Sequence, residues 1–379
     1  MMTNASQNIE SLVERIKSAA NTGTPLRIRG GGTKDFYGQS LQGDILDTAG
    51  LNGISSYEPS ELVVTVKAGT PLTELEAVLA EKNQCLPFEP PHFKPGATVG
   101  GMVAAGLSGP ARASSGSVKD FVLGVNMVNG KGEALHFGGT VMKNVAGYDV
   151  SRLMAGSMGT LGLITEVSLK VLPIAPAEAT LKFECTQQQA IDRLNAWGAQ
   201  PLPLNASCWV AESGQGSLYL RLRGAVAAVD AAIKKMGAEH GGVLQNAASG
   251  NETVAADWQA LRNQNWRSMD FFKLQGDECL WRLSVPDTVP DLQLGDTIVE
   301  WHGAQRWVKR SASEAAHIRS QVNAIGGNAI LFIAAQAINT PATAVFNPLK
   351  APLDRIHRKL KQEFDPAGIF NRGRMFTDM

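Results

Sequence analysis

The chain has 379 residues, of which 44% are hydrophobic and 18% charged, and its 35 basic residues balance 35 acidic ones. This length favours two domains over a single core. A net charge of zero gives no electrostatic reason to expect nucleic acid as a partner. The four cysteines are scattered and form no CxxC pair, so they cannot build an iron–sulfur cluster or a structural zinc site.

The sequence has no pattern typical of secretion or of a membrane span. Its first stretch, MMTNASQNIESLVERIK, contains acidic residues and lacks the apolar segment of a secretory signal. The longest apolar run, residues 329–338, is about half of what a bilayer requires. We therefore expect a cytoplasmic protein with reduced thiols, which would lie at the inner membrane only through a partner.

Residues 1–88 alternate between helical and strand patterns. Apolar residues at helical spacing predict a first helix: Ile9, Leu12, Val13, Ile16 and Ala20. Strand patterns follow at 26–29, 44–47 and 61–69. Thr70 and Pro71 then predict a helix start with a capping hydroxyl and a proline at the first position. Together these patterns predict a small α+β subdomain.

Residues 89–173 differ in composition from the segment before them. Prolines and a glycine- and alanine-rich run open this segment, and they offer little side-chain volume for packing. Strand patterns return in FVLGVNMVNGKGEALHF, where Asn129 and Gly130 predict a hairpin turn, and again at 161–173. The segment is predicted to form a second subdomain.

Residues 174–345 contain all seven tryptophans and are predicted to form a separate domain. The segments AIDRLNAW and AAVDAAIKKMG predict two helices among its strands. Residues 346–379 predict a last helix, which ends at Asp365 and Pro366 before a loop with glycine. The apolar face of this helix would carry Leu353, Ile356, Leu360 and Phe364.

Four glycine-bearing stretches carry the chemical signal: RGGGTK (29–34), PGATVGG (95–101), SSGSVKD (114–120) and GSMGTLG (156–162), with FNRGR (370–374) near the end. Glycines let successive N–H groups point into one concavity that holds an anion. Neither the P-loop spacing nor a strand–GxGxxG–helix unit is present. Each loop alone could be a tight turn, but together they predict a site for a phosphate-bearing cofactor.

In order and spacing, four segments resemble the FAD-binding domain of the vanillyl-alcohol oxidase (PCMH) type: PLRIRGGGTK, KPGATVGGMVAAGLSGP, SGSVKDFVLGVNMVNGKGE and KNVAGYDVSRLMAGSMGTLGLITEVSLKV. The tail FDPAGIFNRGRM resembles that family's FDPxxxxNPG ending, with Arg372 where proline is usual. NVAGYDVSRLMAGSMGTLG and EWHGAQRW resemble, in particular, the FAD-binding E subunit of three-subunit bacterial glycolate oxidases.

This resemblance implies an α+β fold in three parts. A PCMH-type FAD-binding domain would span residues 1–173, with α+β subdomains at about 1–88 and 89–173. A smaller α+β cap domain would span 174–345, as a substrate or interface domain. The tail, 346–379, would return to the flavin.

The resemblance also implies site residues. The first pyrophosphate loop would be Arg29, Gly30, Gly31, Gly32, Thr33 and Lys34, and the second Pro95, Gly96, Ala97, Thr98, Gly100 and Gly101. The ribityl and pyrophosphate part would run along Ser115, Gly116, Val118 and Asp120, the adenine end would meet Gly156, Gly162 and Ile164, and Asn371 would approach the isoalloxazine.

The resemblance further implies that the FAD is not covalently bound. Thr33 stands where several relatives carry the histidine that bonds to the flavin, and threonine cannot form that bond. The second attachment point of bicovalent relatives, a cysteine, is missing from 108–116. We expect dissociable FAD.

Catalytic candidates are fewer. No two histidines lie at i, i+3 or i, i+4 spacing, so no metal site is predicted. His302 is the best candidate for a catalytic group, with Arg306 as a possible anchor for a substrate carboxylate. Alternatively, Trp301, His302 and Trp307 only pack and hydrogen-bond within the cap. Arg267 and Arg282 are more typical of solvated or paired arginines than of substrate clamps. Lys143 and Asn144 resemble a stretch that faces the flavin, which suggests a role beside it.

The expected function is that of the FAD-binding subunit of a multi-subunit glycolate oxidase. The complex would oxidise glycolate or a similar 2-hydroxyacid to the 2-oxoacid, and electrons would pass to an iron–sulfur subunit. A larger FAD-containing subunit would be the catalytic partner. Two alternatives stay open: an autonomous FAD-dependent 2-hydroxyacid dehydrogenase, and a non-catalytic assembly subunit that retains the fold. The HGDGN-like histidine motif of the larger catalytic relatives is absent, which argues against autonomous turnover.

Overall fold

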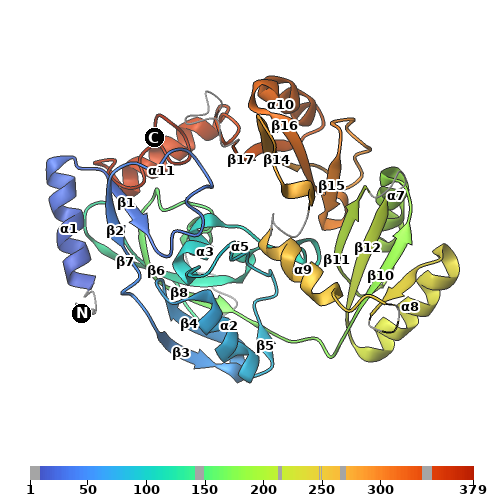
Figure 1. Ribbon diagram of the computed structural model, residues 1–379. Coiled ribbons are helices and arrows are strands. Elements are labelled where there is room, and N and C mark those ends of the chain that lie inside the picture. Colours follow the sequence, from blue (N-terminus) through green and yellow to red (C-terminus); the bar gives the residue numbers. More distant parts are fainter. Residues whose placement is uncertain are drawn as a thin grey trace.

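The computed structural model describes residues 9–140, 149–211, 216–246, 248, 250–264, 270–334 and 344–379. The chain forms two lobes that lie side by side (Figure 1). The first lobe contains the N-terminal part of the chain and the last helix, and the second lobe, called the cap here, is built around the strands from β10 to β17. Lys143, Asn144 and Arg267 lie outside the described residues.

The first lobe starts with a small unit in which both ends of the chain meet. Helix α1 (Ile9–Thr22) buries Leu12, Ile16 and Ala19, as its apolar spacing predicts. Strand β1 (Leu26–Arg29) pairs in parallel with β2 (Asp44–Asp47), and both strands lie where the sequence predicts them. Phe370 from the tail adds a parallel bridge to Leu26. The C-terminal segment therefore completes the structure that the N-terminal segment begins.

The main sheet of this lobe follows, among the described residues, the order β3–β4–β8–β6–β7, and each neighbouring pair is antiparallel. Its strands are β3 (Ile54–Glu58), β4 (Val63–Lys67), β6 (Val122–Val128), β7 (Ala134–Gly138) and β8 (Leu163–Lys170). β4 pairs with β8 from Val63 opposite Lys170 to Lys67 opposite Glu166. The sheet therefore crosses the boundary predicted at residue 88, because strands from both sides of it share one hydrogen-bonded ladder.

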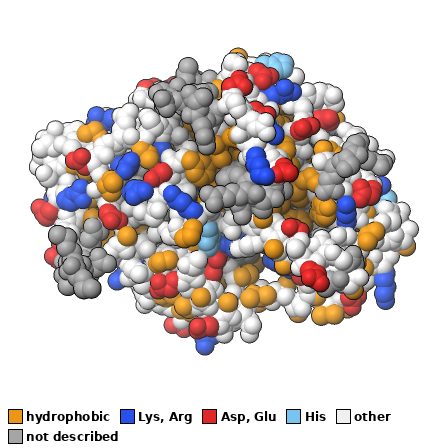
Figure 2. Space-filling model, in the orientation of Figure 1, with side chains coloured by type: hydrophobic (Ala, Val, Ile, Leu, Met, Phe, Trp, Pro, Cys, Tyr) orange, Lys and Arg blue, Asp and Glu red, His pale blue; other side chains and the backbone are white. Residues whose placement is uncertain are grey.

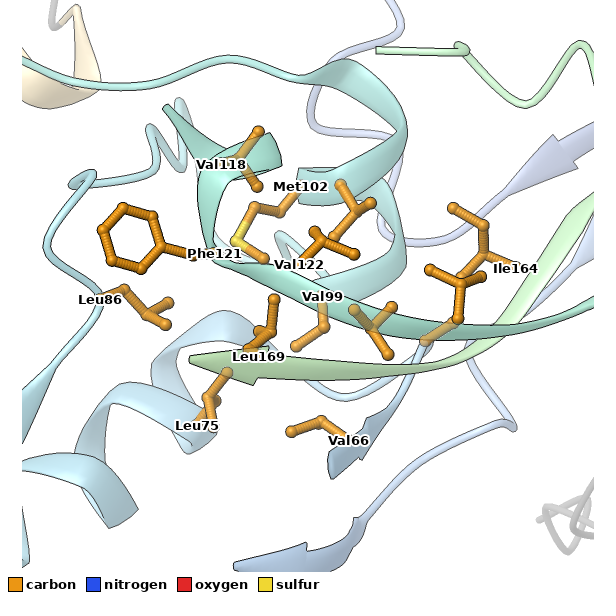
Figure 3. Packing of buried hydrophobic residues seen from close by; sticks show 14 of the residues in the cluster. Val66, Leu75, Leu86, Val99, Met102, Val118, Phe121, Val122, Ile164 and Leu169 are labelled. Atoms are coloured by element: carbon orange, nitrogen blue, oxygen red, sulfur yellow. The ribbon is translucent and has the colours of Figure 1, made fainter. Parts of the chain in front are cut away.

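Helices cover one face of this sheet and form the core seen in Figure 3. Leu75 comes from α2 (Leu72–Glu81), Val99 and Met102 from α3 (Val99–Ala105), and all three pack with strand residues such as Val66 and Leu169. The smaller elements are α4 (Arg112–Ser115), α5 (Val118–Phe121), α6 (Val150–Leu153), the 3-10 turn η1 (Pro59–Glu61), and the strand pair β5 (Gln84–Cys85) with β9 (Leu172–Pro173).

One local prediction needs correction. Thr70 does not cap α2: Pro71 is the N-cap residue, and the Thr70 hydroxyl instead accepts a 2.9 Å hydrogen bond from the Gly53 N–H.

The predicted hairpin turn is confirmed, since β6 and β7 are joined by a loop of residues 129–133 that begins with Asn129 and Gly130. The Asn129 side chain organises this loop by accepting bonds from the N–H groups of Lys131 and Glu133, each at 3.0 Å.

The cap is an antiparallel sheet with the order β13–β10–β12–β11–β15–β16–β14–β17 among the described residues. Its strands are β10 (Ala177–Glu184), β11 (Leu204–Val210), β12 (Ser217–Gly224), β13 (Val243–Gln245), β14 (Glu278–Ser284), β15 (Thr297–Glu300), β16 (Gln305–Ser311) and β17 (Asn328–Ile333). Its helical elements are α7 (Gln187–Gly198), α8 (Val226–His240), α9 (Val254–Asn263), α10 (Ala315–Ala324), and the 3-10 turns η3 (Asp270–Phe272), η4 (Trp301–Gly303) and η5 (Ala312–Glu314).

The two faces of the cap sheet have different partners because side chains alternate along each strand. One face packs against α7, α8 and α10, with Leu220 and Trp281 among its buried residues. The other face, called the inner face here, carries Leu280, Trp307 and Phe332, which pack with Tyr37 of the first lobe. Hydrophobic side chains are visible along the seam between the lobes in Figure 2. The inner face is thus the wall that the cap presents to the glycine loops.

Polar contacts fix the two lobes together. The carboxylate of Glu89 accepts a 3.0 Å bond from the Ala111 N–H and pairs with Arg221 of β12 at 2.6 Å. The Trp301 indole N–H donates to the Gly109 carbonyl at 3.0 Å. These contacts all converge on the segment that leads into α4.

The last helix, α11 (Leu353–Phe364), lies over the first lobe near the C-terminus (Figure 1). Leu360 and Phe364 pack on the core of that lobe, whereas Leu353 and Ile356 are 53% and 45% exposed. The predicted apolar face is therefore confirmed as a pattern, but only its second half is covered by this chain.

Candidate functional site

The first two glycine loops touch each other through their backbones. A Cβ added to Gly31 would lie 1.6 Å from the Gly96 carbonyl oxygen, and one added to Gly30 would lie 2.5 Å from Thr98 Oγ1. Thr98 also caps α3, where its hydroxyl accepts a 3.2 Å bond from the Gly101 N–H. No side chain fits at these positions, so the loops form a close-fitting cradle.

The cradle opens into a hollow with contributions from four parts of the chain. Its lining includes residues 28–35, Leu41, Thr98, Gly101, Ala104, Ala105, Met158, Asn371 and Arg374. The structure therefore brings together the whole first predicted loop, part of the second and the tail. In the second loop, Ala97 and Gly100 pack towards the core instead, since a Cβ on Gly100 would lie 2.7 Å from that of Ala68.

Lys34 supplies a positive charge beside the cradle. Its ammonium group lies 3.3 Å from the Thr33 hydroxyl and 5.6 Å from the centre of the Phe93 ring. Burial lowers the pKa of Lys34 to about 8, and no carboxylate among the described residues offsets that effect. Arg29, by contrast, is already paired with Asp35 at 3.0 Å. An anion in the cradle would give Lys34 the counter-charge that it lacks.

The tail holds the cradle in place. Asn371 accepts a 2.8 Å bond from the Ile28 N–H and donates a 2.6 Å bond to the Met158 carbonyl. Arg374 is buried and donates to the carbonyls of Lys34, Asp35, Tyr37 and Gln39. The Asn371 amide is thus bonded to backbone groups while the residue also lines the cradle, and its approach to the isoalloxazine stays a prediction. Sequence reasoning missed Arg374, although its place after FDPxxxxN was a usable signal.

The predicted residues of the fourth glycine loop lie in two different places: Gly156 beside the cradle, and Gly162 and Ile164 at the start of β8. Gly156 donates to the Val103 carbonyl at 2.9 Å, which places this loop against the end of α3 and beside the cradle. Gly162 and Ile164 lie farther along, at the start of β8, where Ile164 pairs with Met127. A Cβ on Gly162 would lie 2.3 Å from the Met127 side chain. Tight strand packing therefore accounts for Gly162.

The third loop stands apart from the cradle lining. Asp120 caps α5 by accepting 2.8 Å bonds from the N–H and the hydroxyl of Ser117, and these bonds contribute to a lowered pKa although burial acts in the opposite direction. Val118 is buried in the core, and Gly116 ends α4 with a φ of 97°. Ser115 lines a separate cleft between the lobes. These residues shape the backbone around α4, and no side chain among them lines the cradle.

His302 joins the two lobes. One ring nitrogen, Nε2, lies 2.9 Å from the Ser114 hydroxyl of α4, and the other, Nδ1, lies 3.1 Å from the Ser207 hydroxyl of β11. Burial lowers the pKa of His302 to about 4, against the opposing effect of Asp287, so the ring is neutral at pH 7. Trp301 and His302 both adopt left-handed backbone, with φ of 52° and 56°. The contacts describe a bridge between the lobes, in line with the packing alternative.

Arg306 does not anchor a substrate in this structure. It is 1% exposed, and its guanidinium donates to the carbonyls of Val289, Pro290 and Gly303. These bonds satisfy the buried charge within the cap, on the side of the sheet away from the cradle. The sequence signal, an arginine near a histidine, could not reveal that alternate residues of β16 face opposite sides.

Two other arginines lie at the seam between the lobes. Arg112 of α4 stacks over the Trp301 ring, 4.5 Å from its centre, and Arg282 of β14 lies 5.9 Å from the centre of the Tyr37 ring. Among the described residues, no group of three or more histidine, cysteine or acidic side chains could hold a metal ion. None of the described helices is long and apolar enough to cross a membrane.

The cradle suits the pyrophosphate of FAD. Gly30, Gly31 and Gly32 provide backbone N–H groups without a Cβ in the way, and Thr33 provides a hydroxyl. Lys34 provides a cation that forms no ion pair with any described residue. The hydrophobic seam beside it, with Ala105, Met158 and Tyr37, suits an aromatic ring system.

Comparisons with known proteins agree with this assignment. The model of the family described as "FAD binding domain" matches residues 5–150. Glycolate oxidase subunit GlcE of Escherichia coli (strain K12) is 43% identical over 371 residues, which cover 98% of each chain. Glycolate oxidase subunit GlcD of Bacillus subtilis (strain 168) is 29% identical over 179 residues, 47% of this chain and 38% of that protein.

Among solved structures, an alkyldihydroxyacetonephosphate synthase is similar with a TM-score of 0.65, over 96% of this chain and 75% of that one. Its sequence is 14% identical, so the likeness shows a shared α+β fold. The resemblance stated from the sequence is thus confirmed for the fold, the cofactor and the family. The chain binds FAD and belongs to the family of FAD-dependent glycolate oxidase subunits that includes GlcE.

Proposed function

We propose that the chain is the FAD-binding subunit of a multi-subunit glycolate oxidase, which oxidises glycolate to glyoxylate. The observation that carries the proposal is the cradle: two glycine loops in backbone contact, with the cation of Lys34 beside them. GlcE, a glycolate oxidase subunit, is similar over nearly the whole chain. FAD, when bound here, would supply an acceptor for the electron pair of the 2-hydroxyacid.

In this proposal the chain's own residues bind, orient and shield. Gly30 to Gly32, Thr33 and Lys34 hold the pyrophosphate, and Arg374 fixes the loop that carries them. The inner face of the cap, with Trp307 and Phe332, excludes water from the seam where the ring system lies. His302 stays neutral and holds α4 against the cap.

We further propose that an iron–sulfur subunit takes up the electrons and that a larger FAD-containing subunit is the second partner. Any carrier beyond FAD would belong to another chain, because the scattered cysteines offer no cluster motif. The exposed half of α11 is a suitable contact surface for a partner. Leu353 and Ile356 are exposed there, and a cavity of about 220 Å³ lies beside the helix, lined by Leu153, His357, Met375, Phe376 and others.

The partner that fits this surface is an acidic protein segment with an apolar side chain for the cavity, because α11 exposes Arg355 and Lys359, whereas Arg358 is paired with Asp378. Leu353→Glu should abolish co-purification with the partner subunits and leave the flavin spectrum of the chain unchanged. Val226→Glu, at a position 53% exposed on α8, is the matched control. Equal loss of co-purification in both variants would contradict the assignment of α11.

The function is tested by visible spectra under anaerobic conditions. The purified chain should show FAD absorbance that is released on denaturation, and the assembled complex should bleach when glycolate is added. A colourless chain after reconstitution with FAD would overturn the proposal, as would a complex whose flavin glycolate leaves unchanged. Bleaching of the isolated chain by glycolate would favour the alternative of an autonomous 2-hydroxyacid dehydrogenase.

A further inference from the structure

Arg282 is an arginine of the inner face, and no acidic side chain in the part of the chain that the structure describes forms an ion pair with it. Its guanidinium lies 5.6 Å from the centre of the Phe332 ring and donates a long 3.4 Å bond to the Tyr37 hydroxyl. Its Nε is buried and has no hydrogen-bond partner. A buried guanidinium donor without an acceptor is costly, so this arrangement is expected where a ligand completes the set.

Arg112 approaches the same place from the first lobe. It lies on α4, and its guanidinium stacks on Trp301, whose indole in turn donates to the Gly109 carbonyl. Burial lowers the pKa of Arg112, and the positive charge of Arg282 lowers it further. The two guanidinium groups are therefore close enough to repel each other across the seam.

Two acidic side chains of this region, Asp120 and Glu300, accept hydrogen bonds from residues other than the two arginines. Asp120 acts on Arg112 only at a distance and is bound to Ser117. Glu300, fully buried in the cap, accepts bonds from Trp307 Nε1 at 2.5 Å and Gln305 Nε2 at 3.0 Å. Among the described residues, no ion pair includes Arg112 or Arg282. Two like charges from two lobes thus face one seam, and no described carboxylate lies between them in an ion pair.

We propose that Arg112 and Arg282 form a binding site for a small carboxylate, which lies between the lobes and accepts hydrogen bonds from both guanidinium groups. Arginine suits this task because its fork matches the two oxygens of a carboxylate. The Tyr37 hydroxyl adds a neutral donor beside the same ligand. The assignment of this carboxylate to a 2-hydroxyacid rests on the proposed function. The assignment of the site to a small carboxylate is independent of it.

The left-handed turn at Trp301 and His302 positions one side of this site. Trp301 and His302 hold α4 through Gly109 and Ser114, and so they fix the position of Arg112 opposite Arg282. His302 is in this view a positioning residue.

The test uses the FAD-loaded chain and oxalate. Oxalate carries carboxylate groups but has neither a hydroxyl group nor a hydrogen on carbon, so it cannot be oxidised as a 2-hydroxyacid is. Calorimetry and the shift in melting temperature should both report binding to the wild-type protein. Arg282→Gln and Arg112→Gln should each weaken oxalate binding at least tenfold, and Arg282→Lys should weaken it less. Lys235→Gln, an equal charge change on the outer helix α8, is the control and should bind as the wild type does. Glycolamide, which is uncharged, should not compete.

Three results would overturn the site. Oxalate could bind Arg282→Gln as well as it binds the wild type. Glycolamide could also compete with oxalate for the wild-type protein as well as glycolate does. Alternatively, Arg282→Gln could lower the flavin reduction potential and leave oxalate binding unchanged, which would assign the charge to the flavin instead. FAD absorbance and a cooperative melt establish that each variant is folded. Because oxalate binding needs no turnover, the site can stand even if glycolate fails to reduce the flavin.

Discussion

Lys34 offers a quantitative test of the cradle. Burial lowers its pKa from 10.5 to about 8 in the protein without a bound anion. A pyrophosphate beside the ammonium group would favour the charged form and return the pKa to its ordinary value or above. FAD binding would therefore take up a proton between these two pKa values. Since the free protein loses this proton as the pH rises, FAD affinity must fall over the same range.

The size of the effect follows from the shift. If the pKa returns to its ordinary value, linkage predicts that the dissociation constant rises about 30-fold from about pH 7 to pH 9.5, or roughly 2 kcal/mol. Fluorescence titration of the FAD-depleted chain with FAD at several pH values measures this directly. Lys34→Arg should bind FAD with no such dependence, because its charge persists, and Lys34→Met should bind more weakly and without the slope.

Lys131→Met, on the exposed loop between β6 and β7, is the matched control and should behave as the wild type does. An equal pH slope in the wild type and in Lys34→Met would refute the reasoning. Such a result would mean that another group titrates and that Lys34 does not face the pyrophosphate.

Three other variants test separate features. Gly31→Ala should abolish FAD binding and cost about 1–3 kcal/mol of unfolding free energy through overpacking, measured by urea unfolding, whereas Gly198→Ala, with open space at its Cβ, should do neither. Asp365→Asn removes the buried partner 2.7 Å from Lys361 and should cost about 3 kcal/mol in the same assay; an unchanged midpoint would contradict the role of this pair. His302 is neutral in the folded chain down to its pKa of about 4, whereas the unfolded chain binds a proton near pH 6.5. Stability should therefore fall by about 3 kcal/mol as the pH drops between these values, and His302→Gln should lose this dependence in melting curves recorded across that range.

The sequence predicts the parts of the fold that depend on local pattern. Apolar spacing locates α1, α7, α8 and α11, and alternation locates β1, β2 and β4, because each pattern reports a face that must be buried. Local pattern could not predict that strands from both sides of residue 88 form one sheet. Pairing of β4 with β8 joins residues about a hundred positions apart, and no local pattern encodes such a partner.

The same limit applies to the candidate site. The glycines of the first loop could be assigned because a cofactor cradle needs positions without a Cβ, and Gly31 indeed tolerates none. The role of Arg306 could not be predicted, since its burial against the 289–290 carbonyls depends on which face of β16 it occupies. The proximity of Arg112 and Arg282 could not be predicted either, because they come from different lobes and only the folded cap places them together.

The tail has a consequence for how the protein is made. Arg374 and Asn371 are far in sequence from the loop that starts at residue 28, yet they hold it in place. Because residues 371 and 374 follow that loop by 343 and 339 positions, a nascent chain cannot complete its nucleotide pocket until both residues have left the ribosome. Loading with FAD therefore waits for a late stage of synthesis, and a chain truncated before residue 371 would be expected to lack colour.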